Sequence, residues 1–140
     1  INDEISTNFT GQILLTHLLL PLLANKDNSY IINTTSALGA FPKAEGLVYS
    51  ATKAAMRNFT IGLRFALKNS GIKVFEFIPP VTATDMTSGR DEKKLSAGKL
   101  IDAIIPQLIK ERNILTVRNI RIFIWIAARF PNLAQKIMTK

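Results

Sequence analysis

Apolar residues recur at helical spacing in two long segments of the chain. In residues 5–24 they are three to five positions apart, and the pattern ends after Pro21 at the polar residues 25–29. A second helical pattern covers residues 49–68 and ends at Gly71. The positions that define the two apolar faces are Ile5, Phe9, Ile13, Leu14, Leu18 and Leu22, and then Ala54, Ala55, Phe59, Leu63, Ala66 and Leu67.

Two shorter apolar runs have the length of buried strands. Residues 30–32 lie between turn-forming residues, and residues 72–78 alternate before they fill with apolar side chains. Pro79 and Pro80 end the second run because proline has no backbone N–H to donate to a sheet. A strand, a long helix and a second strand form the crossover unit of a parallel sheet. We therefore expect an α/β fold in which residues 34–46 are a loop.

The last third of the chain continues this alternation less clearly. Residues 87–100 are polar and charged, and we interpret the charged run 90–94 within them either as a solvated charge cluster or as part of a substrate lid. A helix is expected over residues 100–110 despite Pro106, and a last short strand over 114–117.

The composition is that of a globular protein. With 140 residues, of which 47% are apolar and 20% charged, the chain is long enough for one domain with a core. It has no cysteine, which excludes disulfides and thiolate chemistry. His17, its only histidine, has no second ligand type nearby, so we expect it to pack or to lie at an interface rather than to bind metal. No apolar run reaches the roughly 18 to 20 residues of a spanning helix, and no secretion signal is visible, so we expect a cytoplasmic protein.

The net charge of +8 is concentrated in the C-terminal part. Residues 86–140 contain 11 basic and 4 acidic residues, and no acidic residue follows Arg112. Residues 118–140 form a basic amphipathic helix, broken at Pro131, with Trp125 near its polar boundary. Its apolar face could pack on the domain or on a second subunit, or it could lie on an anionic membrane surface as a peripheral contact. Nucleic acid is not an expected partner.

Tyr49 and Lys53 are the strongest candidates for chemistry. They are four positions apart at the start of a helix, which places them on one face. A neighbouring ammonium favours phenolate over phenol, as acid-base catalysis by a tyrosine requires. Ser36 precedes Tyr49 by thirteen residues and lies where the first strand ends, so its hydroxyl could contact the same substrate oxygen.

These segments together resemble the short-chain dehydrogenase/reductase family. The resemblance is carried by Asn8 within residues 7–11, Ser36 within 35–39, the stretch from Tyr49 to Lys53, and residues 79–84. It implies that Tyr49 exchanges a proton with the carbonyl or alcohol oxygen, and that Ser36 orients and polarises that oxygen. It also implies that Lys53 stabilises the phenolate and holds the nicotinamide ribose, and that Asn8 fixes a water in the proton relay.

The family resemblance also implies a cofactor, NAD or NADP, and a small-molecule carbonyl or alcohol substrate. Residues 79–84 would lie at the nicotinamide, with Thr84 and the backbone of Val81 touching its carboxamide. Pro79 and Pro80 stand where the family usually has Pro-Gly. This pair and residues 129–131 are similar to the subgroup of oxidoreductases encoded beside lipoteichoic acid D-alanylation genes.

The sequence matches only the second half of the family fold. It contains no glycine-rich turn after a first strand and no ribose-selecting acid or base after it. We therefore expect a partial doubly wound, Rossmann-type parallel sheet that lacks the N-terminal dinucleotide-binding half. Residues 1–117 would be the C-terminal catalytic half and residues 118–140 a basic amphipathic tail. Such a chain would be an incomplete, inactive portion of an NAD(P)-dependent oxidoreductase.

The resemblance places the common dimer interface of the family on the two long helices. We accordingly expect a homodimer or tetramer through residues 5–24 and 49–68. The alternative function is a truncated, non-catalytic interaction module that associates through these helices and docks on a membrane by its tail.

Overall fold

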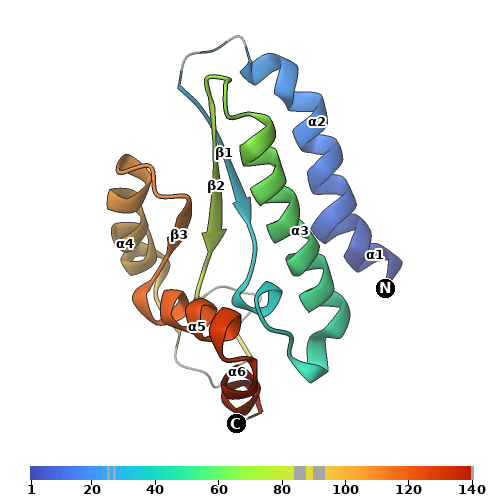
Figure 1. The fold of residues 1–140 in the computed structure, drawn as a ribbon, viewed down its shortest axis with the longest axis vertical. Helices are drawn as coiled ribbons and strands as arrows, with labels where there is room; N and C mark the ends of the chain where they lie inside the picture. The colour runs from blue at the N-terminus through green and yellow to red at the C-terminus, as the bar shows by residue number, and fades with distance from the viewer. Residues whose placement is uncertain (25, 27, 84–87, 90–93, 140) are drawn as a thin grey trace.

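Three parallel strands form the sheet in the computed structural model of the chain (Figure 1). The structure describes residues 1–24, 26, 28–83, 88–89 and 94–139. Strand β1 lies beside β2 and β2 beside β3, and the register of the first pair runs from Ser29 opposite Ile72 to Thr34 opposite Phe77. The strands are β1 Ser29–Thr34, β2 Ile72–Ile78 and β3 Ile114–Thr116. The expected partial doubly wound parallel sheet is confirmed.

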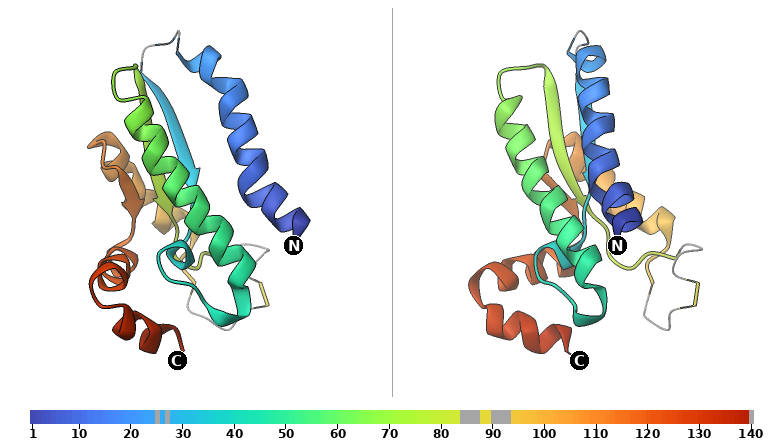
Figure 2. Two further views of the ribbon diagram at one scale, coloured as in Figure 1. Left: turned by 45° about the vertical axis from the view of Figure 1, so that its right-hand side comes forward. Right: turned by 90° about the vertical axis from the view of Figure 1, so that its right-hand side faces the viewer.

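Helices cover both faces of this sheet. The helical elements are α1 Asn2–Ile5, the π-helical turn η1 Ser6–Thr10, α2 Gly11–Leu23, the 3-10 turns η2 Ala37–Gly39 and η3 Ala44–Gly46, α3 Leu47–Ala66, α4 Ala97–Ile109, α5 Arg118–Arg129 and α6 Pro131–Met138. Figures 1 and 2 show α3 against one face and α4 against the other, with α5 and α6 near the ends to which the strand arrows point. Functional side chains of parallel α/β folds gather at this carboxyl end of the strands.

The apolar core lies between the sheet and α4. Phe75 of β2 and Leu115 of β3 are buried against Leu100 and Ile104 of α4. Successive residues of a strand point to opposite faces. Because Phe75 points towards α4, its neighbours Val74 and Glu76 point towards α3.

The face of α3 that packs on the sheet is more polar than the sequence pattern predicted. Its buried residues are Ser50, Thr52, Met56 and Thr60, whereas Ala54 and Ala66 of the expected apolar face are exposed. The reason is the polar surface that the strands present: Asn33 of β1 is buried, and its Nδ2 donates a hydrogen bond of 3.0 Å to Oγ1 of Thr60. The helix therefore matches a polar partner with hydrogen bonds.

Strand β1 and helix α2 are more exposed than expected. Tyr30 and Ile32, assigned to a buried strand, are 46% and 45% exposed. In α2, Leu14, Leu18 and Leu22 are 58%, 70% and 66% exposed, and no residue of that helix is buried. Tyr30 and Ile32 lie on the opposite face of the sheet from Asn33, and the core against α4 is built on β2 and β3, so this face of β1 is left uncovered.

Candidate functional site

The ammonium group of Lys53 lies between the end of β1 and the ring of Tyr49. Its Nζ donates a hydrogen bond of 3.2 Å to the backbone carbonyl of Thr34 and lies 5.6 Å from the centre of the Tyr49 ring. Burial lowers the pKa of Lys53, because removal from water disfavours the charged form. The structure thus brings together the two residues whose four-residue spacing pointed to one helix face.

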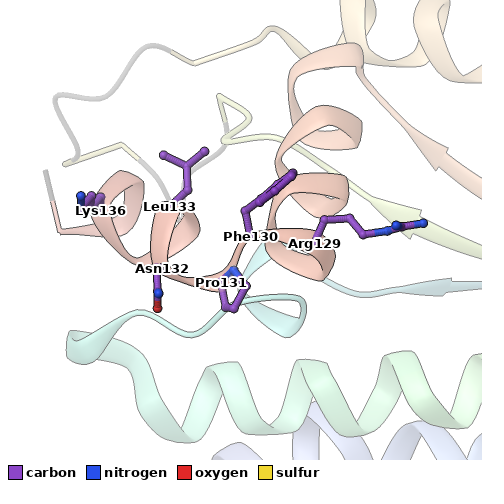
Figure 3. A pocket seen from close by; sticks show the side chains of 6 residues that line it. All are labelled: Arg129, Phe130, Pro131, Asn132, Leu133 and Lys136. Carbon is purple, nitrogen blue, oxygen red and sulfur yellow. The ribbon is translucent and has the colours of Figure 1, made fainter.

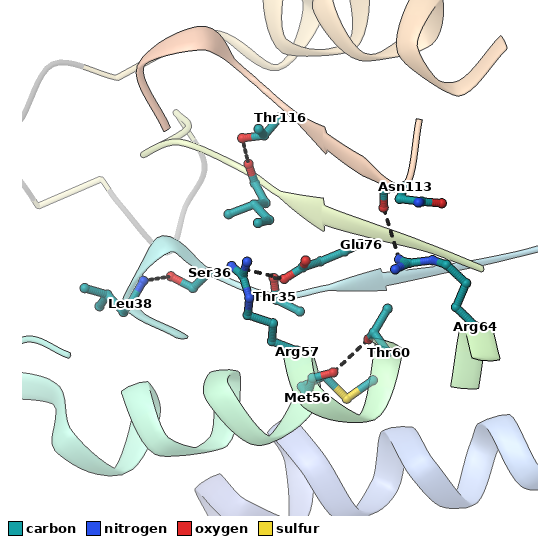
Figure 4. Close-up of polar contacts among 11 residues, drawn as sticks. Thr35, Ser36, Leu38, Met56, Arg57, Thr60, Arg64, Glu76, Asn113 and Thr116 are labelled. Carbon is teal, nitrogen blue, oxygen red and sulfur yellow. Dashed lines mark hydrogen bonds and ion pairs between the residues drawn. The ribbon is translucent and has the colours of Figure 1, made fainter. Parts of the chain in front are cut away.

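Ser36 follows β1 directly and caps the turn η2. Its Oγ accepts a hydrogen bond of 3.2 Å from the backbone N–H of Leu38 (Figure 4), which leaves the hydroxyl proton free to be donated elsewhere. The turn is held close to α3 at Gly39, where an added Cβ would lie 2.7 Å from the carbonyl carbon and oxygen of Lys53. A glycine is needed for this approach, and the approach sets the Ser36 turn against the helix that carries Tyr49.

Asn8 lies in the π-helical turn η1, between α1 and α2. It is half-buried, and the turn contacts α3. A single π-helical turn within an α-helix widens the coil and is frequent at functional sites. Local periodicity could not reveal this turn, because the apolar spacing continues through it.

A buried polar network that the sequence analysis missed lies directly behind the Ser36 turn (Figure 4). Oγ1 of Thr35 donates a hydrogen bond of 2.8 Å to Oε1 of Glu76, and Nη1 of Arg57 lies 3.7 Å from the same oxygen. Glu76 is 1% exposed, and Nη1 of Arg57 is buried without a hydrogen-bond partner. The available signal was an acidic residue within the apolar run 72–78, since a carboxylate in a buried strand requires partners.

The segment after β2 is joined to the start of α4. Thr82 forms an isolated parallel bridge with Leu95, whose N–H donates to the carbonyl of Val81 at 3.0 Å. Pro79 and Pro80 are half-buried at the end of β2. Thr84, expected at the nicotinamide, lies outside the described residues.

Helices α5 and α6 meet near the same end of the sheet. The junction has an open pocket of about 410 Å³ in which the side chains of Phe130 and Leu133 point to one side of the ribbon and Asn132 to the other (Figure 3). Helix α5 also contacts η2, the turn capped by Ser36. The break between the helices falls at Phe130, and Pro131 occupies the first position of α6.

The comparison with protein families decides the assignment. The family model described as short chain dehydrogenase matches residues 1–95. The chain belongs to the short-chain dehydrogenase family.

Curated relatives agree with this membership, and a solved structure agrees with the fold. The chain is 36% identical over 112 residues to the NADP-dependent 3-hydroxy acid dehydrogenase YdfG of Salmonella typhi, covering 76% of this chain and 45% of the relative. It is 36% identical over 95 residues to the uncharacterized oxidoreductase DltE of Bacillus subtilis, covering 67% of this chain and 38% of the relative, which agrees with the subgroup resemblance. A short-chain dehydrogenase of Burkholderia cenocepacia, solved with NADP, superimposes with a TM-score of 0.88 at 20% identity, covering 99% of this chain and 59% of that one.

This short-chain dehydrogenase chain thus spans about half the length of the curated relatives it matches. The structure brings Lys53 to Tyr49, and it packs the Ser36 turn and the Asn8 turn on the same helix. The catalytic and cofactor-contact roles of these residues stay predictions.

Two further observations concern metal binding and membrane spanning in the described part of this short-chain dehydrogenase. Among the residues in 1–24, 26, 28–83, 88–89 and 94–139, no three His, Asp or Glu side chains are grouped to hold a metal ion. In the same ranges, no helix combines the length and the apolar character needed to cross a membrane.

Proposed function

We propose that this chain is the catalytic half of an NAD(P)-dependent oxidoreductase that acts on a carbonyl or secondary alcohol. The observation that carries the proposal is the position of Lys53, hydrogen-bonded to the Thr34 carbonyl and 5.6 Å from the Tyr49 ring centre. A cation beside a tyrosine favours acid-base catalysis by it, because the positive charge stabilises the phenolate. Membership of the short-chain dehydrogenase family supports the same chemistry.

Each residue would have a separate task in carbonyl reduction. When bound, a reduced nicotinamide supplies the hydride that adds to the carbonyl carbon. Tyr49 donates its hydroxyl proton to the carbonyl oxygen, and Ser36 donates a hydrogen bond to that oxygen with the proton that Leu38 leaves free. Alcohol oxidation is the reverse, with Tyr49 taking the proton. We further propose that Asn8 holds a water that returns the proton.

The donor set at Lys53 fits the ribose of a nicotinamide nucleotide. Nζ uses one N–H on the Thr34 carbonyl, so two of its three donors remain for ribose hydroxyls. We place Pro79, Pro80, Val81 and Thr84 at the nicotinamide ring by family resemblance. NADP in the name of the Salmonella relative and in the Burkholderia structure supports NAD(P), without a choice between NAD and NADP.

The test requires the N-terminal half of the family fold, to which no part of this chain corresponds. A fusion of residues 1–140 to the N-terminal half of the Salmonella relative would be assayed with NADPH and NADH against a panel of carbonyls. Tyr49→Phe should lower turnover on the order of 100-fold to 10,000-fold. Tyr30→Phe is the matched control, since Tyr30 is the other tyrosine and lies exposed on β1. Undiminished turnover in Tyr49→Phe contradicts the proposed role.

The 140-residue chain by itself is expected to bind the dinucleotide weakly. Its seven glycines are scattered, so no glycine-rich turn is present to cradle a pyrophosphate. Calorimetry of the isolated chain with NADPH checks this expectation, and micromolar affinity would overturn it.

We also propose that the protein self-associates through α2 and α3, as a dimer or tetramer. The supporting observation is the apolar surface they expose, which includes Leu14, Leu18 and Leu22 of α2 and Phe65 of α3. Exposed apolar patches of this kind mark interfaces.

For residues 118–140 we propose packing at the catalytic end of the domain in preference to a peripheral membrane contact. Ala134 is fully buried, Ile120 and Phe123 are half-buried, and α5 contacts η2. The division of the chain into residues 1–117 and 118–140 stays a prediction.

A further inference from the structure

An open groove outside the catalytic site is lined by four cations. It lies between the C-terminal half of α4, strand β3 and the start of α5, and has a volume of about 390 Å³. Lys110, Arg112, Arg118 and Arg121 line it, and none of the described acidic side chains does. In Figure 1, α4 lies on the far side of the sheet from α3, the helix that carries Tyr49 and Lys53, and β3 is the strand farthest from β1 in the order of the sheet.

Three of these cations have no partner among the residues that the structure describes. Within the described part of the chain, the side chains of Lys110, Arg112 and Arg118 make no hydrogen bond or ion pair. The neighbouring carboxylate, that of Glu111, is hydrogen-bonded to Lys73 and does not line the groove. Repulsion among like charges in one concave surface is therefore not compensated by the described side chains that line it.

The fourth cation is fixed in place. Nη2 of Arg121 donates hydrogen bonds of 2.7 Å to Oε1 of Gln107 and 3.1 Å to the carbonyl of Ile114. Gln107 is itself held, because its Nε2 donates to the carbonyls of Ala103 and Thr116 at 2.8 and 2.9 Å. Arg121 is thus oriented before any ligand arrives, with its remaining N–H groups available.

We propose that this groove is a binding site for a phosphate-bearing anion. Guanidinium groups present paired N–H donors that match the oxygens of phosphate, and three arginines line the groove beside one lysine. The volume exceeds what one phosphate needs, so a diphosphate or a phosphorylated headgroup fits it better. The shared chemistry is the phosphate group, and its source is either a free phosphate compound or a phospholipid.

The experiment titrates the full chain with pyrophosphate by calorimetry at low and at raised salt, and separately sediments it with vesicles of phosphatidylcholine alone or with added phosphatidic acid. Saturable binding is expected that weakens with salt, because exposed charges are screened. The double variant Arg112→Gln with Arg118→Gln should reduce affinity at least tenfold. Both side chains are exposed and unpaired, so folding should persist, which circular dichroism checks.

Arg129→Gln is the matched control, since it removes one charge from the same helix α5 but does not line the groove. Saturable pyrophosphate binding with this pattern of variants supports a free phosphate compound. The same pattern on phosphatidic acid vesicles alone supports a lipid headgroup. Absence of saturable binding in both arms, or a loss in Arg129→Gln equal to that in the double variant, overturns the proposal.

Discussion

The hydroxyl of Thr35 donates a hydrogen bond to the carboxylate of Glu76 across 41 positions of sequence. This contact joins the residue just before Ser36 to the middle of β2, and the N–H of Thr35 also donates to the carbonyl of Phe77 at 2.9 Å. The start of the Ser36 turn is therefore anchored to the sheet by side chain and backbone together. Arg57 adds a second partner for the same carboxylate from α3.

Replacement of Glu76 should destabilise the fold. Glu76→Gln keeps the size but loses the charge opposite Arg57, and should lower the free energy of unfolding by about 1–3 kcal/mol. Glu76→Ala should cost about 3 kcal/mol or more, because it leaves a cavity and partners without an acceptor. Urea unfolding measures both. Glu45→Gln, at a side chain 75% exposed, is the control and should change stability by less than about 0.5 kcal/mol. Equal effects at the two sites would refute the anchoring role.

Gly39→Ala should disturb the turn that carries Ser36. The new Cβ would lie 2.7 Å from backbone atoms of Lys53, so either the turn or α3 must shift, at a cost of about 1–3 kcal/mol. Gly62→Ala is the contrasting variant: nothing lies within 4 Å of its Cβ, and alanine in a helix interior should stabilise by up to about 1 kcal/mol. Thermal unfolding of both variants tests the difference in sign.

At alkaline pH, two lysines should change the free energy of unfolding in opposite directions as the pH rises. Burial lowers the pKa of Lys53 below its ordinary 10.5. Between the folded-state pKa and 10.5 the unfolded chain binds more protons, so the Lys53 contribution to stability rises with pH across that window. The hydrogen bond to Glu111 raises the pKa of Lys73, so its contribution is present below 10.5 and is lost as pH rises through the folded-state pKa.

The two contributions can be separated by variants. Lys53→Gln should remove the rising component of the stability profile, and Lys73→Gln should remove the falling one. Urea midpoints measured from about pH 8 to pH 11 give the profiles. An unchanged profile in Lys53→Gln would show that this ammonium is as well solvated in the folded chain as in the unfolded one.

Charged substitutions on α2 should alter association without unfolding the chain. Leu18 and Leu22 are 70% and 66% exposed, so lysine at both positions should change the free energy of unfolding by less than about 0.5 kcal/mol each. If α2 forms the subunit interface, sedimentation velocity should show a shift towards monomer. Leu133→Lys, on α6, is the control that should leave the oligomer intact.

Local sequence patterns predicted where the helices and strands lie better than they predicted which of their faces are buried. Strand β2 has the bounds expected from its alternation and the two prolines. The continuous helical segment formed by α1, η1 and α2, and the helix α3, begin and end within about three residues of the predicted bounds. The prediction of the buried face of α3 was wrong, because periodicity cannot show that Asn33 and Glu76 make the opposing sheet surface polar. The exposure of Tyr30 and Ile32 depends on which strands α4 covers, which is equally invisible to a local window.

In the candidate site, too, some contacts could be predicted from the sequence and others could not. The proximity of Tyr49 and Lys53 follows from helix geometry and could be read from their spacing. The acceptor for Lys53 is a backbone carbonyl, that of Thr34, and backbone acceptors leave no mark in the sequence. The contact between Gly39 and Lys53 is likewise a property of the assembled fold.

The bridge between Thr82 and Leu95 closes the chain between them into a loop. Both ends of the intervening segment meet at this bridge, so its length can vary without displacing β2 or α4, provided that Thr84, proposed above as a cofactor contact, is kept. Doubling the length of such a closed loop costs only about 0.6 kcal/mol of entropy. The bridge is therefore a natural junction at which this segment could be exchanged between relatives while the proton-transfer residues are kept unchanged.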